Sequence, residues 1–306
     1  FDYVYWSSPV ANFSSAAISP TSPAGYIFKW NPTYANPNGS QGYWMPGTET
    51  MTAGLGYIVI GPSSFSSSTS APFTATFSGV PNNGIIQPII SRGSYTGAPY
   101  VSPNLSTITN LDDNWNLLGN PYPSAIDALS FLSLNSNING NVRLWTHGST
   151  ISAANANPFY GSYSYNYNAN DYVSYNGTGS TPPGFNGKIG AGQGFFVIMN
   201  DGAASSSTAT FNNSLRSNTY SNSQFYKTTN SSSSESTLEK NRIWLSLVNT
   251  NAVAATTLVG YISGATYAED RIFDASHKPT TELGIYSWIN DKTYIINGRP
   301  TPFDDT

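Results

Sequence analysis

The sequence predicts an all-β protein, with two related β-sandwich or jelly-roll-like units and part of a third β-sandwich domain. Three observations lead to this prediction. Short apolar runs are separated by clusters of Gly, Pro and Asn along the whole chain, which is typical of strands joined by turns. Four sequence blocks occur twice in the same order. A polar low-complexity stretch then precedes a further group of strand-like runs.

The composition indicates a folded protein with an unusual surface. Charged residues make up 9% of the 306 residues, against roughly 25% in an average protein. Aromatic residues reach 14%, and so many large side chains can bury enough apolar area to offset the entropy lost on folding. A surface that is poor in charge and rich in Ser, Thr, Asn and Tyr favours an extracellular, cell-surface location.

Composition also argues against several classes of protein. The 12 Lys and Arg residues are scattered and the net charge is −4, so the chain lacks the basic stripe that nucleic-acid binding requires. No apolar run approaches the roughly 18 residues of a membrane span, and no membrane insertion is expected. The absence of cysteine excludes disulfides and thiolate metal sites.

The four repeated blocks indicate an internal duplication. Tyr3 aligns with Trp115, and Trp6 aligns with Leu118. The segment "AGLGYIVI" aligns with "AGQGFFVI", so that a glycine pair precedes an apolar strand in both copies. The aligned blocks are 2–10 with 114–122, 26–32 with 141–147, 51–60 with 189–198, and 73–79 with 207–213.

These patterns predict four segments. The first β-sandwich unit covers 1–108, and the second covers 109–228 with a long Tyr-rich insertion. Residues 229–239, which include "TNSSSSEST", form a polar linker. A partial β-domain follows at 240–306, with strands expected at 242–249 and 256–262 and two strands within 284–298. Because no clear closing strand is present, we expect this domain to continue beyond Thr306.

Two conspicuous motifs have structural explanations. The "GAGQGFF" segment leads into a strand and not into a helix, so its glycines favour a turn and a close backbone approach over phosphate binding. In "NPYP" the prolines end a strand, and only the first proline has a counterpart in the other copy. Residues 124–135 predict a short helix with Ser124 as N-cap and Asp127 at N3.

Six tryptophans lie in apolar runs and are predicted to belong to the core. They are Trp6, Trp30, Trp115, Trp145, Trp244 and Trp288.

The sequence contains no recognisable catalytic constellation, and we predict no catalytic residues. His147 and His277 are far apart in sequence and lack repeated carboxylate or hydroxyl companions; isolated histidines are usually surface or hydrogen-bonded structural residues. Four isolated carboxylates could serve acid–base chemistry, but nothing links any two of them as a glycosidase would require. They are Asp127, Asp171, Asp201 and Asp270. The sequence therefore favours a protein that is not an enzyme.

Calcium is the one cofactor with a weak sequence signal. The turns at 110–114 and 168–172 contain Asp112, Asp113 and Asp171, and a third Asp-rich turn lies at 268–274. Such turns offer the oxygen ligands that Ca²⁺ prefers, but none has the EF-hand spacing. Asx-turns that close strands are the favoured explanation, and no other cofactor or metal is expected.

A group of tyrosines in the insertion is the main candidate contact site. They alternate with Ser, Asn and Gly, so that one set could face outward and contact a ligand or a partner chain. A buried hairpin face explains the pattern as well, and both interpretations remain open. The residues are Tyr160, Tyr163, Tyr165, Tyr167, Tyr172 and Tyr175.

The segments "MTAGLGYIVIGP", "NLLGNPYPSAIDA", "NDYVSYNGTG", "GKIGAGQGFFVIM", "EKNRIWLSL" and "INGRPTPFDD" resemble, in this order, the region that precedes the C-terminal sorting domain in large exported surface proteins of Bacteroidota. Those proteins are substrates of the type IX secretion system. The resemblance covers nearly the whole chain. It implies export and display at the cell surface, often in adhesin-like proteins, and it carries over no catalytic residues.

Taken together, the sequence predicts a non-enzymatic extracellular structural or adhesive protein and a candidate fibre or filament subunit. Its expected partners are further copies of itself or other cell-surface proteins, with glycans as a further candidate. The alternative is a carbohydrate-binding module of a larger secreted protein, in which Tyr165, Tyr167 and Tyr172 would stack on sugar rings.

Overall fold

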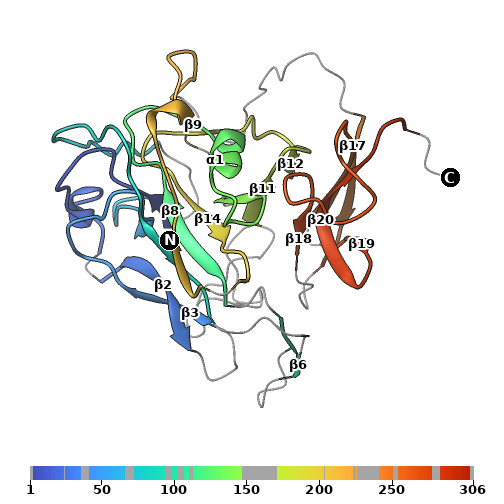
Figure 1. Ribbon diagram of the computed structural model, residues 1–306. Helices are drawn as coiled ribbons and strands as arrows, with labels where there is room; N and C mark the ends of the chain where they lie inside the picture. The colour runs from blue at the N-terminus through green and yellow to red at the C-terminus, as the bar shows by residue number, and fades with distance from the viewer. Residues whose placement is uncertain are drawn as a thin grey trace. The chain divides into compact units, whose positions relative to one another are not determined.

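The fold is all-β, as the sequence predicts (Figure 1). The computed structural model describes residues 3–23, 25–35, 41–65, 72–93, 98, 100–101, 107–109, 113–146, 171–202, 204–222, 225, 241–250, 254–277 and 283–303. The chain forms two compact units. The first contains Phe1–Asp127 and Ile189–Phe225, and the second contains Ala128–Lys188 and Tyr226–Thr306.

The first unit contains a four-stranded antiparallel sheet in the order β1-β4-β2-β3. The strands are β1 (Tyr3–Trp6), β2 (Ile27–Ala35), β3 (Gln41–Pro46) and β4 (Tyr57–Ile60). Aromatic rings hold one face of this sheet, because Trp30 and Trp44 both make edge contacts with Phe196, at centroid distances of 5.5 and 6.0 Å. Such edge-to-face pairs add to the stability that burial alone gives.

Two further strand pairs complete the first unit. β8 (Trp115–Gly119) pairs with β14 (Gly194–Ile198), and β5 (Ile89–Ser91) pairs with β15 (Ser206–Thr208), both antiparallel. β6 (Tyr100–Val101) and β7 (Thr107–Ile108) form a small hairpin. β9 (Ile126–Asp127) and β13 (Lys188–Ile189) lie where the chain passes between the units. Short 3₁₀ turns occur at Ser15–Ala17 and Asn213–Leu215.

The repeated blocks form the same strand pair in the same register. Tyr3 is opposite Ile60 in the first copy, and the aligned residues Trp115 and Ile198 are opposite each other in the second. At the other end of the pair, Trp6 faces Tyr57 and Leu118 faces Phe195. Because register is set by which side chains must face the core, this agreement supports the internal duplication.

The two copies also exchange equivalent backbone hydrogen bonds. Ser7 N–H donates to the Gly192 carbonyl at 2.7 Å, and the aligned Gly119 N–H donates to the Gly54 carbonyl at 3.0 Å. Gly54 and Gly192 have φ of +85° and +68°, a conformation that glycine adopts without strain. The predicted role of these glycines in a turn and a close backbone approach is therefore confirmed.

The second unit begins with α1 (Ala128–Leu134), followed by an antiparallel ladder of β10 (Val142–Trp145), β11 (Tyr172–Tyr175) and β12 (Ser180–Thr181). Its second sheet has the order β16-β17-β20-β18. The strands are β16 (Arg242–Val248), β17 (Ala254–Tyr261), β18 (Ala275–Ser276) and β20 (Lys292–Arg299), with β19 (Ser287–Ile289) also paired to β20. The strands predicted in this region all form.

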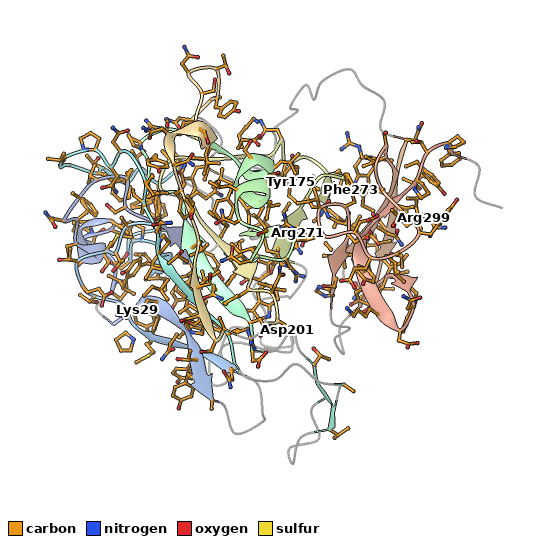
Figure 2. The ribbon with its side chains drawn as sticks, in the orientation of Figure 1. Lys29, Tyr175, Asp201, Arg271, Phe273 and Arg299 are labelled. Carbon is orange, nitrogen blue, oxygen red and sulfur yellow. The ribbon has the colours of Figure 1, made fainter. Side chains whose placement is uncertain are left out.

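Segments far apart in sequence are joined closely inside the second unit. The Thr178 hydroxyl donates to the Phe273 carbonyl at 2.7 Å, and the Trp244 indole N–H donates to the Ser180 carbonyl at 2.9 Å. The Arg271 guanidinium donates to the carbonyls of Leu132 and Ile138 (Figure 2). The 241–303 region thus packs against residues of the second repeat. The boundaries predicted at 108/109 and 228/229 stay predictions.

Two details of the sequence prediction are wrong. Ser124 does not cap the helix: α1 begins at Ala128 after the short strand β9, and the Ser124 hydroxyl instead accepts a hydrogen bond from Arg216 Nε at 2.7 Å. Trp288 is 64% exposed and does not belong to the core, because its side of β19 faces solvent. Trp6 and Trp145 are buried, and the other three predicted core tryptophans are half-buried.

Within the part of the chain that the structure describes, none of the helices has the length and apolar character needed to cross a bilayer.

Candidate functional site

Two of the six predicted contact tyrosines lie on β11, and the other four (Tyr160, Tyr163, Tyr165 and Tyr167) fall outside the described residues. Tyr172 is half-buried, with its ring 5.1 Å from the Trp145 ring in an edge arrangement. Tyr175 packs against Phe185 at the same distance. Packing inside the unit therefore accounts for both rings, and the contact role of the group stays a prediction.

The calcium candidates are buried where they are described. Asp113 and Asp171 are 2% and 1% exposed and belong to different units, while Asp112 falls outside the described residues, as does His147. The Asp171 carbonyl accepts hydrogen bonds from both the N–H and the hydroxyl of Thr146 at 2.7 Å, and these bonds extend the pairing of β10 with β11 by one residue. Among the described residues, no three His, Cys, Asp or Glu side chains gather as a metal-binding group.

The third Asp-rich turn is closed by its own carboxylate. Asp274 Oδ1 accepts a hydrogen bond from the Gly298 N–H at 2.8 Å, and its Oδ2 accepts one from the Asp270 N–H at 2.6 Å. The pKa of Asp274 is raised to about 6, chiefly by burial and also by the nearby charges of Asp270 and Glu269, while the two backbone hydrogen bonds act in the opposite direction. Both oxygens are thus engaged by backbone donors, one four residues earlier in the chain and one on β20.

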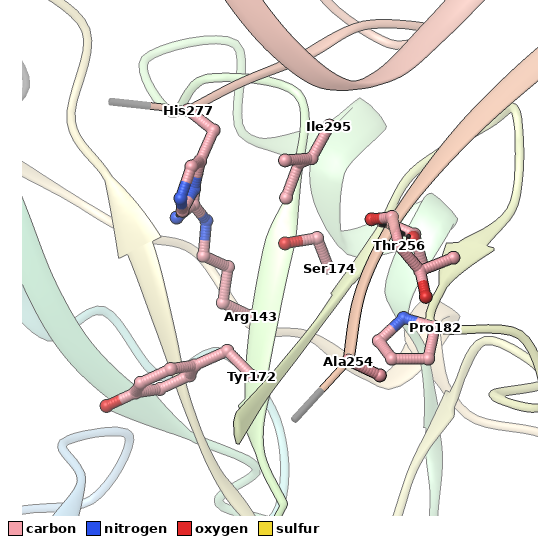
Figure 3. Close-up of a pocket in the computed structure, with 9 residues that line it drawn as sticks. Arg143, Tyr172, Ser174, Pro182, Ala254, Thr256, His277 and Ile295 are labelled. Atoms are coloured by element: carbon pink, nitrogen blue, oxygen red, sulfur yellow. Dashed lines mark hydrogen bonds between the residues drawn. The ribbon is translucent and has the colours of Figure 1, made fainter. Parts of the chain in front are cut away.

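A small cavity inside the second unit is lined by two ionisable groups whose pKa values are lowered by burial, Arg143 and His277 (Figure 3). Its volume is about 40 Å³. A water molecule needs roughly 10–15 Å³ on this measure, and pockets for small organic ligands are usually roughly 300 Å³ or larger. The cavity therefore has room for water only. Its polar lining comes from Arg143, Tyr172, Ser174, Thr181, Thr256 and His277.

Arg143 and His277 form a buried hydrogen-bonded pair beside this cavity. The Arg143 guanidinium donates to the Ser276 carbonyl at 2.7 Å and to His277 Nδ1 at 3.3 Å. Since Arg can only donate, the His277 ring must be neutral with its proton on Nε2. Burial lowers the pKa of Arg143 to about 10, while burial and then the Arg143 charge lower the pKa of His277 to about 3.

This pair has a structural role. A general base works best with a pKa near the operating pH, and His277 lies far below neutral pH. Its ring also stacks on Tyr286 with centroids 5.5 Å apart, so the pair fastens β10 to the loop after β18. The hydrogen-bonded structural histidine predicted from the sequence agrees with this geometry.

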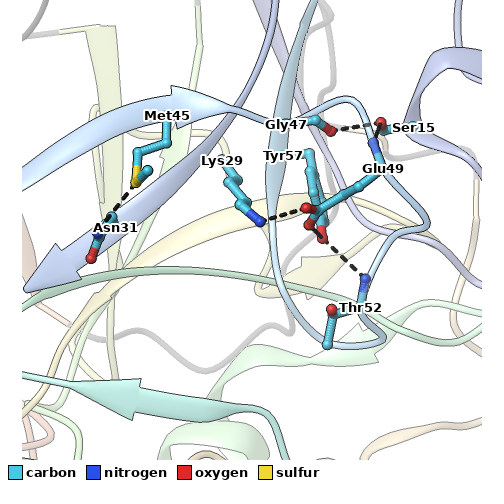
Figure 4. Close-up of polar contacts among 8 residues, drawn as sticks. All are labelled: Ser15, Lys29, Asn31, Met45, Gly47, Glu49, Thr52 and Tyr57. Atoms are coloured by element: carbon cyan, nitrogen blue, oxygen red, sulfur yellow. Dashed lines mark hydrogen bonds and ion pairs between the residues drawn. The ribbon is translucent and has the colours of Figure 1, made fainter.

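A second polar network fastens the first unit's sheet (Figure 4). Glu49 accepts hydrogen bonds from Lys29 and from the Tyr57 hydroxyl, and that hydroxyl accepts one from the Thr52 N–H at 3.0 Å. Burial raises the pKa of Tyr57 to about 12, with Glu49 adding to the shift. Burial would raise the pKa of Glu49 as well, but its hydrogen bonds with Lys29 and Tyr57 outweigh this and lower it. The network holds a turn against β4.

Two exposed features were missed by sequence reasoning. The first is an aromatic pair on the β2–β3 hairpin. Tyr34 and Tyr43 are 44% and 51% exposed, with their ring centroids 4.8 Å apart and their planes tilted by 31°. The opposite face of the hairpin is fixed by Trp30 and Trp44. Neither tyrosine lies in the insertion that drew attention in the sequence, and their alignment across the hairpin requires knowledge of the register.

The second exposed feature is an apolar stripe on β16, formed by Ile243, Leu245 and Leu247, which are 39%, 48% and 43% exposed. Val248 at the strand end is 59% exposed. The alternation of apolar and polar residues in this segment predicted a half-buried strand, and the strand forms. The apolar side chains at every second position, however, are the exposed ones. The opposite face carries Trp244, which packs into the unit's core cluster of Leu258, Ala275 and Ile296.

These features define the class of protein as an all-β scaffold with exposed aromatic and apolar surfaces. The whole chain, residues 1–306, matches a family described as a domain of unknown function (DUF8693), and the protein belongs to that family. No curated protein and no solved structure matches the chain.

Proposed function

We propose that the protein is a non-enzymatic structural or adhesive component of the cell surface, which acts by associating with further copies of itself. The observation that carries this proposal is the apolar stripe on β16, because exposed apolar side chains on an edge strand favour protein–protein contact. A fibre or filament follows when such contacts repeat along a chain of subunits.

The buried polar groups support the same view. The Arg143–His277 pair and the Asp274 turn each connect separate segments through hydrogen bonds. Buried, satisfied networks of this kind rigidify a fold. Polar side chains are thus used here to hold strands and turns together, as suits a load-carrying scaffold.

Export is proposed from the sequence. The low charge and the resemblance to exported surface proteins of Bacteroidota support a type IX secretion substrate with an extracellular location. Protease treatment of intact cells tests the location: loss of the protein while a cytoplasmic marker survives would support surface display, and full protection would contradict it.

Electron microscopy of the native material, taken from the cell surface and from the medium, tests the assembly. We expect regular filaments or ordered clusters, because exposed apolar stripes would be covered by neighbouring copies. Antibody labelling against this chain would show that the assemblies contain it. Labelled particles that stay dispersed and monomeric at high protein concentration would contradict the structural proposal.

A carbohydrate-binding function is the second candidate, and the Tyr34–Tyr43 pair favours it. Exposed aromatic faces held on rigid strands suit stacking against sugar rings. We expect Tyr43→Ala to lower retention on a glycan array or on immobilised polysaccharide by about fivefold, since one stacking contact contributes on the order of 1 kcal/mol.

The matched control is Tyr267→Ala. Tyr267 is 59% exposed, but its ring lies under the Arg299 guanidinium and not against another tyrosine. Equal retention of the wild type and both variants, or equal loss in both, would remove the glycan proposal for the Tyr34–Tyr43 pair.

A further inference from the structure

We propose that β16 binds β16 of a second copy of this chain, by antiparallel strand addition around a two-fold axis at Leu245. This inference rests on the proposed structural function and names the contact through which that function would operate. The occupant is a second copy because two antiparallel β16 strands match in their apolar stripes and their outward backbone groups without placing like charges opposite each other.

β16 lacks the features that protect edge strands. Edge strands are usually short, bulged, or interrupted by Pro or Lys, which prevents pairing with other chains. β16 pairs with β17 through seven consecutive residues without a register shift, and its sequence RIWLSLV contains neither Pro nor Lys. It lies at the end of the described sheet.

The edge strand β3, with six residues, shows the contrast. β3 ends at Pro46, and its pairing with β2 has a register shift between Asn31 and Ala35. β18 has two residues and β19 has three, which is too short to support a stable added strand. Among these edge strands, β16 alone is both long and regular.

The backbone of β16 has the correct alternation for an added strand. The Tyr261 N–H donates to the Asn241 carbonyl, so in this antiparallel ladder the odd-numbered residues of β16 bond towards β17. The N–H and C=O groups of Trp244, Ser246 and Val248 then point to the outer edge. A second strand can use them only in registers that bring even-numbered residues opposite one another.

The centred register satisfies this condition and uses all seven residues of the strand. With Leu245 opposite Leu245, Ile243 faces Leu247 and Trp244 faces Ser246. The exposed stripes of the two copies then join on one face of a continuous sheet. The strand's one charged residue, Arg242, comes opposite Val248, so no like charges meet.

Cysteine substitution tests this register directly, because the chain has no cysteine of its own. In the centred register, the two copies of residue 245 form a non-hydrogen-bonded antiparallel pair. Their Cα atoms would lie about 4.5 Å apart, within the range for a disulfide. In Val248→Cys the two Cα atoms would lie about 20 Å apart, since each residue advances the strand by about 3.4 Å. We expect mild oxidation to cross-link Leu245→Cys at least about tenfold faster than Val248→Cys.

Val80→Cys is the matched surface control, because Val80 is 74% exposed in the first unit. If Leu245→Cys and Val80→Cys cross-link at the same rate, random collision explains both and the proposal is overturned. If a cysteine at another position of β16 cross-links fastest, the register centred on Leu245 is wrong. If the protein stays monomeric and cross-links slowly with cysteine at every position of β16, strand addition is overturned.

Charge exchange gives a second, independent test. Leu245→Lys and Leu245→Glu each place like charges opposite each other, and each should raise the dimer dissociation constant by about tenfold. Mixing the two variants should restore a heterodimer in sedimentation velocity. Leu245 is half-exposed, so neither variant should unfold, as circular dichroism would verify.

The outcomes separate this inference from the proposed function. If the protein assembles, but the charge variants and the β16 cysteines leave assembly and cross-linking unaffected, the proposed function stands and this inference fails. A protein that never associates would overturn both.

Discussion

At the scale of single residues, the second unit contains two ionisable groups with opposite effects on stability. His277 stays neutral in the fold because its pKa is lowered to about 3 from 6.5. Asp274 has its pKa raised to about 6 from 3.8. The stabilisation from neutral His277 is complete above pH 6.5 and is lost as the pH falls towards 3. The stabilisation from protonated Asp274 is complete below pH 3.8 and is lost as the pH rises through 6.

We therefore predict that His277→Asn changes the pH dependence of unfolding. The amide oxygen can still accept from Arg143, but the unfolded variant has no imidazole to protonate. Relative to the wild type, its free energy of unfolding should improve by about 1–2 kcal/mol between pH 6.5 and pH 5. Urea unfolding at a series of pH values measures this difference.

Asp274→Asn is the control with the opposite sign, because it removes a group that favours the folded state in acid. Relative to the wild type, this variant should become less stable as the pH falls from 6 to 4. Parallel curves for the wild type and His277→Asn from pH 7 to pH 4 would mean that His277 titrates normally in the folded protein.

At the scale of strands, the sequence identifies most elements because local patterns determine them. The aligned blocks form the equivalent pairs β1·β4 and β8·β14, and their common register follows from the same apolar positions. The glycine that precedes β4 and the glycine that begins β14 were predicted correctly for a similar reason. A Cβ on Gly56 would lie 2.5 Å from Leu117 Cγ, and one on Gly194 would lie 2.9 Å from Tyr5 Cβ, so both positions require glycine.

The sequence is less informative about which face of a strand meets the core. β16 has apolar residues on both faces, and the large Trp244 is packed inward while the regular Ile243, Leu245 and Leu247 stripe stays exposed. Trp288 and the Tyr34–Tyr43 pair were missed for the same reason. Their exposure depends on which distant segments pack beside them, and the periodicity of apolar residues within one segment does not indicate this.

At the scale of the whole molecule, the two repeats differ in which compact unit their residues belong to. The first copy lies entirely in the first unit, whereas residues 128–188 of the second copy share a unit with 226–306. Segment 128–188 meets the 241–303 region through the hydrogen bonds of Arg143, Thr178 and Arg271. The added region thus completes a core for part of the second copy, which explains why contacts cut across the repeat boundary.

This arrangement predicts that one glycine controls the stability of the second unit. A Cβ on Gly140 would lie 1.3 Å from the Arg271 carbonyl oxygen and 2.2 Å from its carbonyl carbon, so Gly140→Ala must push the 241–303 region away from the loop before β10. We expect a loss of about 1–3 kcal/mol, with faster hydrogen exchange in β10, β11 and β17. Exchange in β1, β4 and β14 of the first unit should not change.

Gly202→Ala is the matched control, because a Cβ there meets nothing within 4 Å. If both alanine variants exchange like the wild type, the 241–303 region does not depend on this contact. If Gly140→Ala speeds exchange equally in both units, the two units unfold as one cooperative body.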